Sequence, residues 1–223
     1  LQALTWRSLE MGFHVTLLCA LIGFPAAYVL AKRIKGRWRE ALFLLVVLPF
    51  WSNALVRIFS WTIVLRPDGI LDRAVHLVAP GLPPVDLTDS YTAIIIGLTH
   101  SYLPYMILTC YLSLQAIDDS VIEAARSLGA RAHTILWRII LPLAIPGLAA
   151  GSVLIFVPVI GSFFEPKLLG GTQGAMIGTV IEEQFTVVSN WPLGGALSFI
   201  LLAIVLLILA VSSPFLKQHM RSQ

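Results

Sequence analysis

Long apolar runs without charged residues recur along the chain and dominate its pattern. They cover residues 11–31, 41–56, 90–117, 139–164 and 191–216, and the second run extends to residue 65 if Arg57 is tolerated within it. A helix needs about 20 residues to cross a bilayer. Each run is apolar on all sides, which is typical of membrane helices and not of the amphipathic helices that cover a soluble protein. The pattern therefore predicts an all-α polytopic membrane protein with five spans in this sequence.

Composition agrees with this prediction. Of the 223 residues, 57% are hydrophobic and 12% are charged, whereas globular chains carry about 25% charged residues. The net charge is only +3, and no basic run is interleaved with aromatic residues, which argues against nucleic-acid binding. Cys19 and Cys110 lie inside apolar runs without metal-ligand spacing, and we interpret them as small buried hydrophobic residues.

Basic residues fall in alternate connections and predict the orientation. They are Lys32, Arg33, Lys35, Arg37 and Arg39 after the first run, Arg126, Arg131 and Arg138 after the third, and Lys217 and Arg221 in the tail. By the positive-inside rule these segments are cytoplasmic, whereas residues 66–89 and 165–190 are extracytoplasmic. This topology places Leu1 outside, so we expect a further span upstream and six spans in the full-length protein.

Prolines and glycines interrupt the apolar runs. Pro25, Pro49, Pro104, Pro146 and Pro158 all lie within spans, where membrane helices tolerate proline and kink. Such kinks leave room for a pathway at mid-membrane, although ordinary packing produces them too. Gly147 and Gly151 form a GxxxG pair, which favours close approach of a neighbouring helix.

The connection at residues 118–141 predicts two short helices. Ser120 and Glu123 match a capping box at the start of the first helix, and Gly129 is a typical helix-ending residue. The second helix is expected to begin near Ala132 and to continue into the fourth span. Small residues at Ala124, Ala125 and Gly129 would let a partner approach closely, but the local pattern fits a plain amphipathic loop helix equally well.

This connection resembles a known signature. Glu123-Ala124-Ala125, then Gly129, Ile139 and Leu141-Pro142, resemble the EAA motif of permease subunits of bacterial ABC importers. Residues 48–57, 168–171, 176–178 and 190–194 resemble spermidine/putrescine-type permeases in particular. The resemblance implies a type I ABC importer transmembrane domain: one permease domain over residues 1–223, multi-pass in the bacterial inner membrane, with cytoplasmic coupling helices at about 118–141.

The resemblance also implies partners. Residues expected to dock on an ABC ATPase dimer are Glu123, Ala124, Ala125, Arg126, Leu128, Gly129 and Ala130. A second, similar permease and an external solute-binding protein would complete the assembly. The sequence has no GxxxxGK(S/T) phosphate loop, so ATP and Mg would be bound by the partner ATPase. The expected cargo is a small organic cation, a polyamine; an amino acid, a related amine or a metal ion are alternatives within the same class.

Polar and aromatic residues within the spans are candidates for the pathway, because polar groups in a membrane are costly unless they function. The candidates are Trp51, Asn53, Arg57, Tyr102, Tyr105, Phe163, Phe164, Glu165 and Trp191. Glu165, next to aromatic rings, suits an organic cation, although it could equally pair with Lys167 or Arg57. Arg57 would repel a polyamine unless a carboxylate neutralises it, and the tryptophans near span ends also fit interfacial anchors. His100 could line the passage together with Tyr102 and Tyr105, but we expect it to form a hydrogen bond between packed helices.

Two other classes of function make different demands on the sequence. A membrane enzyme would need HExxH, GxSxG or convergent histidines, and the five histidines are scattered over different segments. We therefore expect no catalytic activity from the chain by itself. An uncoupled channel or scaffold would make the segment around Glu123 dispensable.

Overall fold

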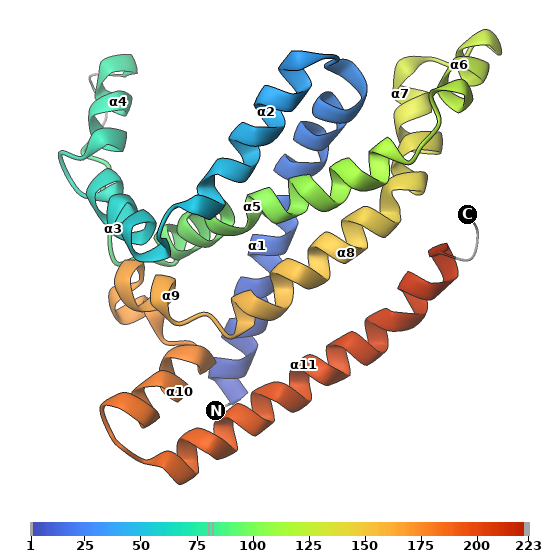
Figure 1. Ribbon diagram of the computed structural model, residues 1–223. Helices are drawn as coiled ribbons and strands as arrows, with labels where there is room; N and C mark the ends of the chain where they lie inside the picture. The colour runs from blue at the N-terminus through green and yellow to red at the C-terminus, as the bar shows by residue number, and fades with distance from the viewer. Residues whose placement is uncertain (1, 80, 82, 221–223) are drawn as a thin grey trace. The chain divides into compact units, whose positions relative to one another are not determined.

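The computed structural model describes residues 2–79, 81 and 83–220, with side chains described as far as residue 210. Within these residues the chain is helical and contains no β-strand. The α-helices, labelled in Figure 1, are α1 (Gln2–Tyr28), α2 (Arg37–Val47), α3 (Ala54–Leu65), α4 (Ile70–Val78), α5 (Tyr91–Gln115), α6 (Asp119–Ser127), α7 (Ala132–Ile135), α8 (Leu141–Ile160), α9 (Phe164–Leu169), α10 (Ile177–Thr186) and α11 (Trp191–Met220). Two π-helical turns, Val29–Arg33 and Leu136–Ile140, extend α1 and precede α8.

Continuous helices account for most of the predicted spans. Four are long and apolar enough to cross a membrane: Gln2–Arg33, Tyr91–Gln115, Ala132–Ile160 and Trp191–Ala210. They confirm the first, third, fourth and fifth apolar runs as helices. The fourth ends at Ile160 rather than at residue 164, so Phe164 and Glu165 belong to the separate helix α9. Of the tail residues, the side chain of Lys217 and all of Arg221 lie outside the described residues.

The second apolar run is not one continuous helix, and the sequence interpretation was wrong on this point. The helices Arg37–Trp51 and Ala54–Val78 together have the length and hydropathy of a span, but they are bent by 96° at the break between them. Pro49 lies in a 3₁₀ turn at the break and has no N–H for a continuing helix. Asn53 then starts α3 afresh, because its Oδ1 accepts from the N–H of Leu55 at 2.8 Å.

The chain divides into two compact units, and the long helices contribute to both. Unit 1 consists of Leu1–Val15, Phe50–Ser101 and Phe156–Leu206; unit 2 consists of Thr16–Pro49, Tyr102–Ile155 and Leu207–Gln223. By sequence, unit 1 holds eight of the 12 acidic residues and only five of the 15 Lys and Arg residues. Unit 2 contains the connections that the positive-inside rule assigns to the cytoplasm, so the charges are divided as that rule predicts.

In unit 1, short helices and loops between the spans are tied together by polar contacts. α9 contacts both α3 and α10. The buried hydroxyl of Ser8 on α1 accepts from the N–H of Ile177 at the start of α10, at 3.0 Å. Asp72 on α4 is 4% exposed and accepts from the N–H of Val85 at 2.7 Å. Specific contacts therefore hold these described parts of the connections in place.

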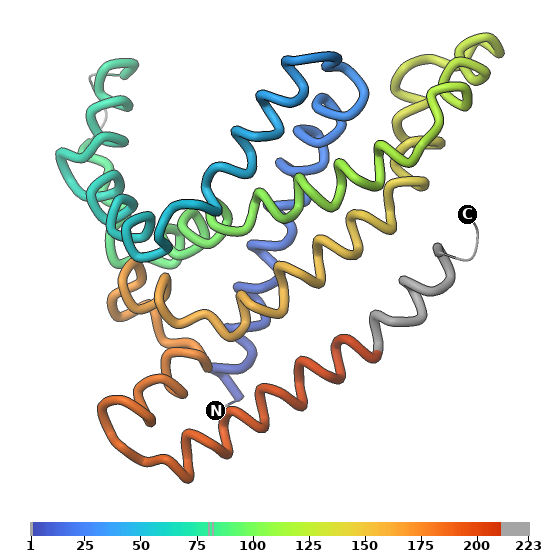
Figure 2. Tube along the Cα trace, in the orientation of Figure 1, coloured from blue at the N-terminus to red at the C-terminus, as the bar shows by residue number. Residues whose placement is uncertain are grey.

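In unit 2, the GxxxG pair packs as the sequence predicted. A Cβ added at Gly147 would lie 2.5 Å from Cβ of Ser113, and one at Gly151 would lie 2.5 Å from Oγ1 of Thr109. Both neighbours are on α5, so these glycines allow α8 to approach α5 closely. After the first span the chain turns back into α2, which contacts the π-helical turn Val29–Arg33; the course of the chain can be followed in Figure 2.

Candidate functional site

Helix α6, in the connection between α5 and α8, begins with a different cap from the one the sequence suggested. Oδ1 of Asp118 accepts from the N–H of Ser120 at 2.9 Å, and the helix starts at Asp119. Asp118 is therefore the N-cap, and the Ser120–Glu123 capping box was wrong. This backbone hydrogen bond is the main reason why the pKa of Asp118 lies below its usual value.

Gly129 ends α6 through its backbone conformation. Its φ is +80°, a left-handed value that suits glycine. The N–H of Ala130 donates to the carbonyl of Ala125 at 3.0 Å, and that of Gly129 donates to the carbonyl of Arg126 at 2.9 Å. This pair of bonds is a Schellman motif, and it confirms Gly129 as the helix-ending residue.

The outer face of α6 combines charged, small and apolar residues. Glu123, Ala124, Arg126 and Gly129 are exposed, and Leu128 is 88% exposed. Ala125 is buried together with Ile122, so it belongs to the inner face and not to the small-residue surface that the sequence suggested. Ala130 is partly buried.

A lysine from the first span reaches the start of α6. Nζ of Lys32 lies 2.7 Å from Oδ1 of Asp119 and donates to the carbonyl of Ile117 at 2.6 Å. The hydrogen bond and charge of Lys32 are the main reasons why the pKa of Asp119 is lowered. In the sequence, Lys32 stands out only as an orientation signal. No local pattern links it to a residue 87 positions away.

The pathway candidates are distributed over both units. Trp51, Asn53, Arg57, Phe163, Phe164, Glu165 and Trp191 belong to unit 1, and Tyr102 and Tyr105 belong to unit 2, where their ring centroids are 6.0 Å apart. Within unit 1, α3 and α9 are in contact, which places the helices of Arg57 and Glu165 next to each other. Trp51 is 89% exposed, and the ring of Trp191 meets Phe185 edge-on at 5.7 Å.

Glu165 is a buried carboxylate. It is 9% exposed and accepts from Oγ of Ser162 at 2.8 Å. The rings of Phe163 and Phe164, directly before it, have centroids 4.2 Å apart. Arg57, on the neighbouring α3, donates from Nη1 to Oγ of Ser52 at 3.3 Å. A buried carboxylate beside aromatic residues is suited to a cation.

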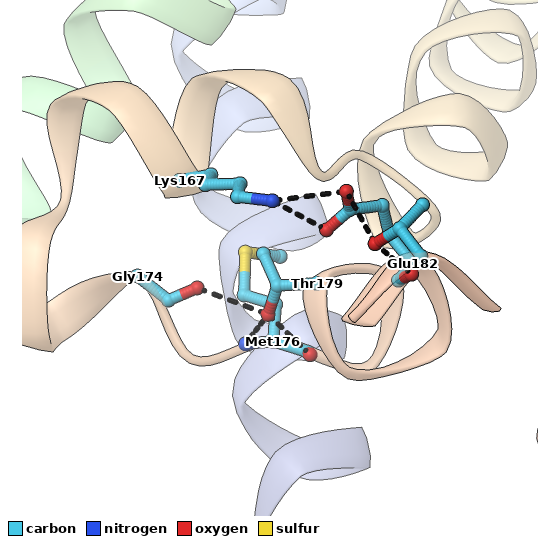
Figure 3. Close-up of polar contacts among 6 residues, drawn as sticks. Lys167, Gly174, Met176, Thr179 and Glu182 are labelled. Atoms are coloured by element: carbon cyan, nitrogen blue, oxygen red, sulfur yellow. Dashed lines mark hydrogen bonds and ion pairs between the residues drawn. The ribbon is translucent and has the colours of Figure 1, made fainter. Parts of the chain in front are cut away.

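Lys167 pairs with Glu182 and not with Glu165, which corrects one of the two alternatives for Glu165. Nζ of Lys167 lies 2.9 and 2.7 Å from the two carboxylate oxygens of Glu182 (Figure 3). The lysine is the main cause of a lowered pKa at Glu182. Nearby, Oγ1 of Thr179 accepts from the N–H of Met176 at 2.9 Å and fixes the start of α10 (Figure 3). The pair joins α9 to α10 beside a hollow of about 320 Å³.

The expected hydrogen bond of His100 is absent from the described residues. Its ring instead meets the ring of Trp61 on α3 edge-on, with centroids 5.4 Å apart. This aromatic contact holds α5 against α3 within unit 1.

The geometry defines a class of protein: a polytopic helical membrane protein that presents a short, partly apolar helix between two late spans. The chain belongs to the family of binding-protein-dependent transport system inner membrane components, whose family model matches residues 23–221. It is thus a multi-pass protein of the inner membrane, with a role in transport and not in catalysis.

Proteins with similar sequences are permeases of transport systems. The chain is 39% identical over 206 residues to the spermidine/putrescine transport system permease protein PotB of Haemophilus influenzae, covering 92% of this chain and 72% of that protein. It is 37% identical over 205 residues to PotB of Escherichia coli, with coverage of 92% and 74%. The inner membrane ABC transporter permease protein YdcU of Escherichia coli is 30% identical over 215 residues, covering 92% and 68%.

Solved structures agree on the fold. A bacterial alginate ABC transporter superposes with a TM-score of 0.75 at 19% identity, covering 92% of this chain and 76% of that chain. The MetNI methionine ABC transporter in an inward-facing conformation gives a TM-score of 0.72 at 18% identity, covering 98% and 95%. The fold is that of a type I ABC importer transmembrane domain, as the resemblance predicted.

Proposed function

We propose that this chain is one permease domain of an ATP-driven importer and forms half of a translocation pathway for a small organic cation, a polyamine. A second, similar permease forms the other half. An external solute-binding protein delivers the cargo, and an ABC ATPase dimer on the cytoplasmic side binds ATP and Mg. The main support for a polyamine as the substrate is the 39% identity to a spermidine/putrescine permease over 92% of the chain.

The coupling role belongs to α6. Its exposed Glu123, Ala124, Arg126, Leu128 and Gly129 form a surface that fits a groove on an ATPase subunit. Ala125 supports this surface from inside, and Ala130 completes the turn at its end. Replacing Glu123 by a bulky residue is expected to abolish ATPase docking or stimulated hydrolysis and to leave membrane insertion intact. Unchanged coupling would favour a channel or scaffold.

The cation pathway is proposed to include Glu165. Desolvation strengthens the attraction between a carboxylate and an ammonium group, and neighbouring aromatic faces add cation–π attraction. The remaining pathway candidates are Trp51, Asn53, Arg57, Tyr102, Tyr105, Phe163, Phe164 and Trp191.

Reconstituted uptake tests the proposal. The complete assembly in liposomes is expected to import spermidine or putrescine with ATP and to discriminate against basic amino acids. Glu165→Gln should reduce cation uptake about tenfold, because a charge-assisted hydrogen bond is lost. Glu183→Gln, an exposed carboxylate on α10, is the matched control. If the wild-type assembly imports only another solute, the polyamine assignment is wrong; if Glu165→Gln transports normally, Glu165 is structural.

A further inference from the structure

The ammonium group of Lys32 lies where three segments of unit 2 meet. Lys32 belongs to the π-helical turn that ends the first span, and its side chain is only 9% exposed. It donates to the carbonyl of Ile117, in the connection after α5, and to Asp119, the first residue of α6. One side chain therefore joins the first span, the end of α5 and the start of α6.

Among the basic residues of this connection, Lys32 is the one that bonds to Asp119, whereas Lys35 and Arg39 act on it only through their charges. Arg33 and Lys35 are exposed and form no hydrogen bond or ion pair through their side chains within the described part of the chain. An ammonium withdrawn from water depends on its acceptors, because a buried charge without partners is costly. The two short bonds to residues 117 and 119 therefore resist separation of α6 from the first span.

The first three residues of α6, at positions 119–121, are exposed. The buried residues of α6 are Ile122, where its first turn closes, and Ala125. Asp118 caps the helix, but its bond to Ser120 is local and anchors α6 to nothing else. Among the described residues, the polar contact that links these first three residues to another helix is the pair formed by Lys32 and Asp119.

We propose that Lys32 is a positioning residue that transmits a displacement of α6 to the first span. Force applied to α6 by an ATPase subunit then moves the ends of α1 and α5 together. This inference rests on the proposed function, because it assigns to Lys32 a part in coupling ATP hydrolysis to transport.

The test is the number of ATP molecules hydrolysed per cation imported by the complete assembly in liposomes. Lys32→Met keeps most of the aliphatic stem and removes the ammonium. It should raise this ratio about tenfold, the effect expected from losing a charge-assisted hydrogen bond. Lys32→Arg can reach both acceptors and should restore a ratio close to that of the wild type. Arg33→Met, which removes the neighbouring exposed charge, should leave the ratio unchanged.

Asp119→Asn provides a second, milder test should Lys32→Met prevent assembly. It keeps an acceptor oxygen but loses the charge, so the ratio should again rise. An unchanged ratio in Asp119→Asn and in any assembled Lys32→Met complex would overturn the inference, whether uptake is retained or falls in proportion to hydrolysis. Failure of the proposed function would be distinct, because the wild-type assembly itself would then show no ATP-driven cation uptake.

Discussion

At the residue scale, two explanations can be compared for the glycine at position 129, after the end of α6. Either its backbone conformation requires glycine, or a side chain there would collide with a neighbour. The φ of +80° at Gly129 requires a left-handed conformation, whereas a Cβ added there would have no neighbour within 4 Å. In this chain the backbone, and not crowding, selects glycine. Alanine should therefore cost about 1 kcal/mol through backbone strain, and asparagine should cost less because it tolerates this conformation.

Variants of Gly129 should therefore differ in stimulated ATPase activity in a definite order. Gly129→Asn should retain more stimulated ATPase activity in the assembled complex than Gly129→Ala. Gly195→Ala, at a glycine with equally free space and no positive φ, serves as the control. The reverse order, with the larger asparagine worse than alanine, would mean that close approach of a partner decides.

The ion pair between Lys167 and Glu182 gives a second prediction at this scale. A double-mutant cycle with Lys167→Met and Glu182→Gln should show a coupling free energy of about 0.5 kcal/mol, because Lys167 is half exposed and water screens the pair. The folded pKa of Glu182 is lowered from its usual 4.5. The coupling should thus persist above that pH and disappear as the pH falls through the lowered value. Thermal unfolding in detergent measures it, and a coupling that does not depend on pH would contradict the ionic origin.

At the element scale, the start of α6 is capped by a different residue from the one that the sequence suggested. Asp118 supplies the capping oxygen, so Asp118→Ala should accelerate tryptic cleavage after Arg126 about fivefold by favouring local opening of the helix. Asp118→Asn keeps an acceptor and should largely preserve protection. Ser120→Ala should have little effect. A larger effect of Ser120→Ala than of Asp118→Ala would mean that Ser120, and not Asp118, caps α6.

The bend between α2 and α3 was not predicted from the sequence, and the reason lies at the same element scale. Hydropathy sums over a window and does not register a bend, so residues 41–65 predicted one helix. Pro49 and the capping side chain of Asn53 break it into α2 and α3. Both signals are present in the sequence, but proline is tolerated in membrane helices, and an Asn cap is recognised only once the helix start is known.

At the scale of the whole molecule, the uneven charge of the two units predicts the orientation. Lys35→Cys, in the basic connection of unit 2, should react with a membrane-impermeant maleimide only after permeabilisation. Asp86→Cys, in unit 1, should react in intact cells. The native Cys19 and Cys110 are fully buried, so background labelling should be low. Labelling of Lys35→Cys in intact cells would reverse the topology and remove α6 from the cytoplasm.

The sequence by itself determined the approximate limits of four spans, the position of α6 and the end of α6 at Gly129. These features depend on local free energies: the transfer of about 20 apolar residues into lipid, and the backbone freedom of one glycine. Only the tertiary structure showed that Lys32 forms an ion pair with Asp119 and that Lys167 forms one with Glu182 and not with Glu165. It also showed that Ala125 is buried. Such pairings depend on which helix surfaces pack together, and residues up to 87 positions apart carry no local record of that choice.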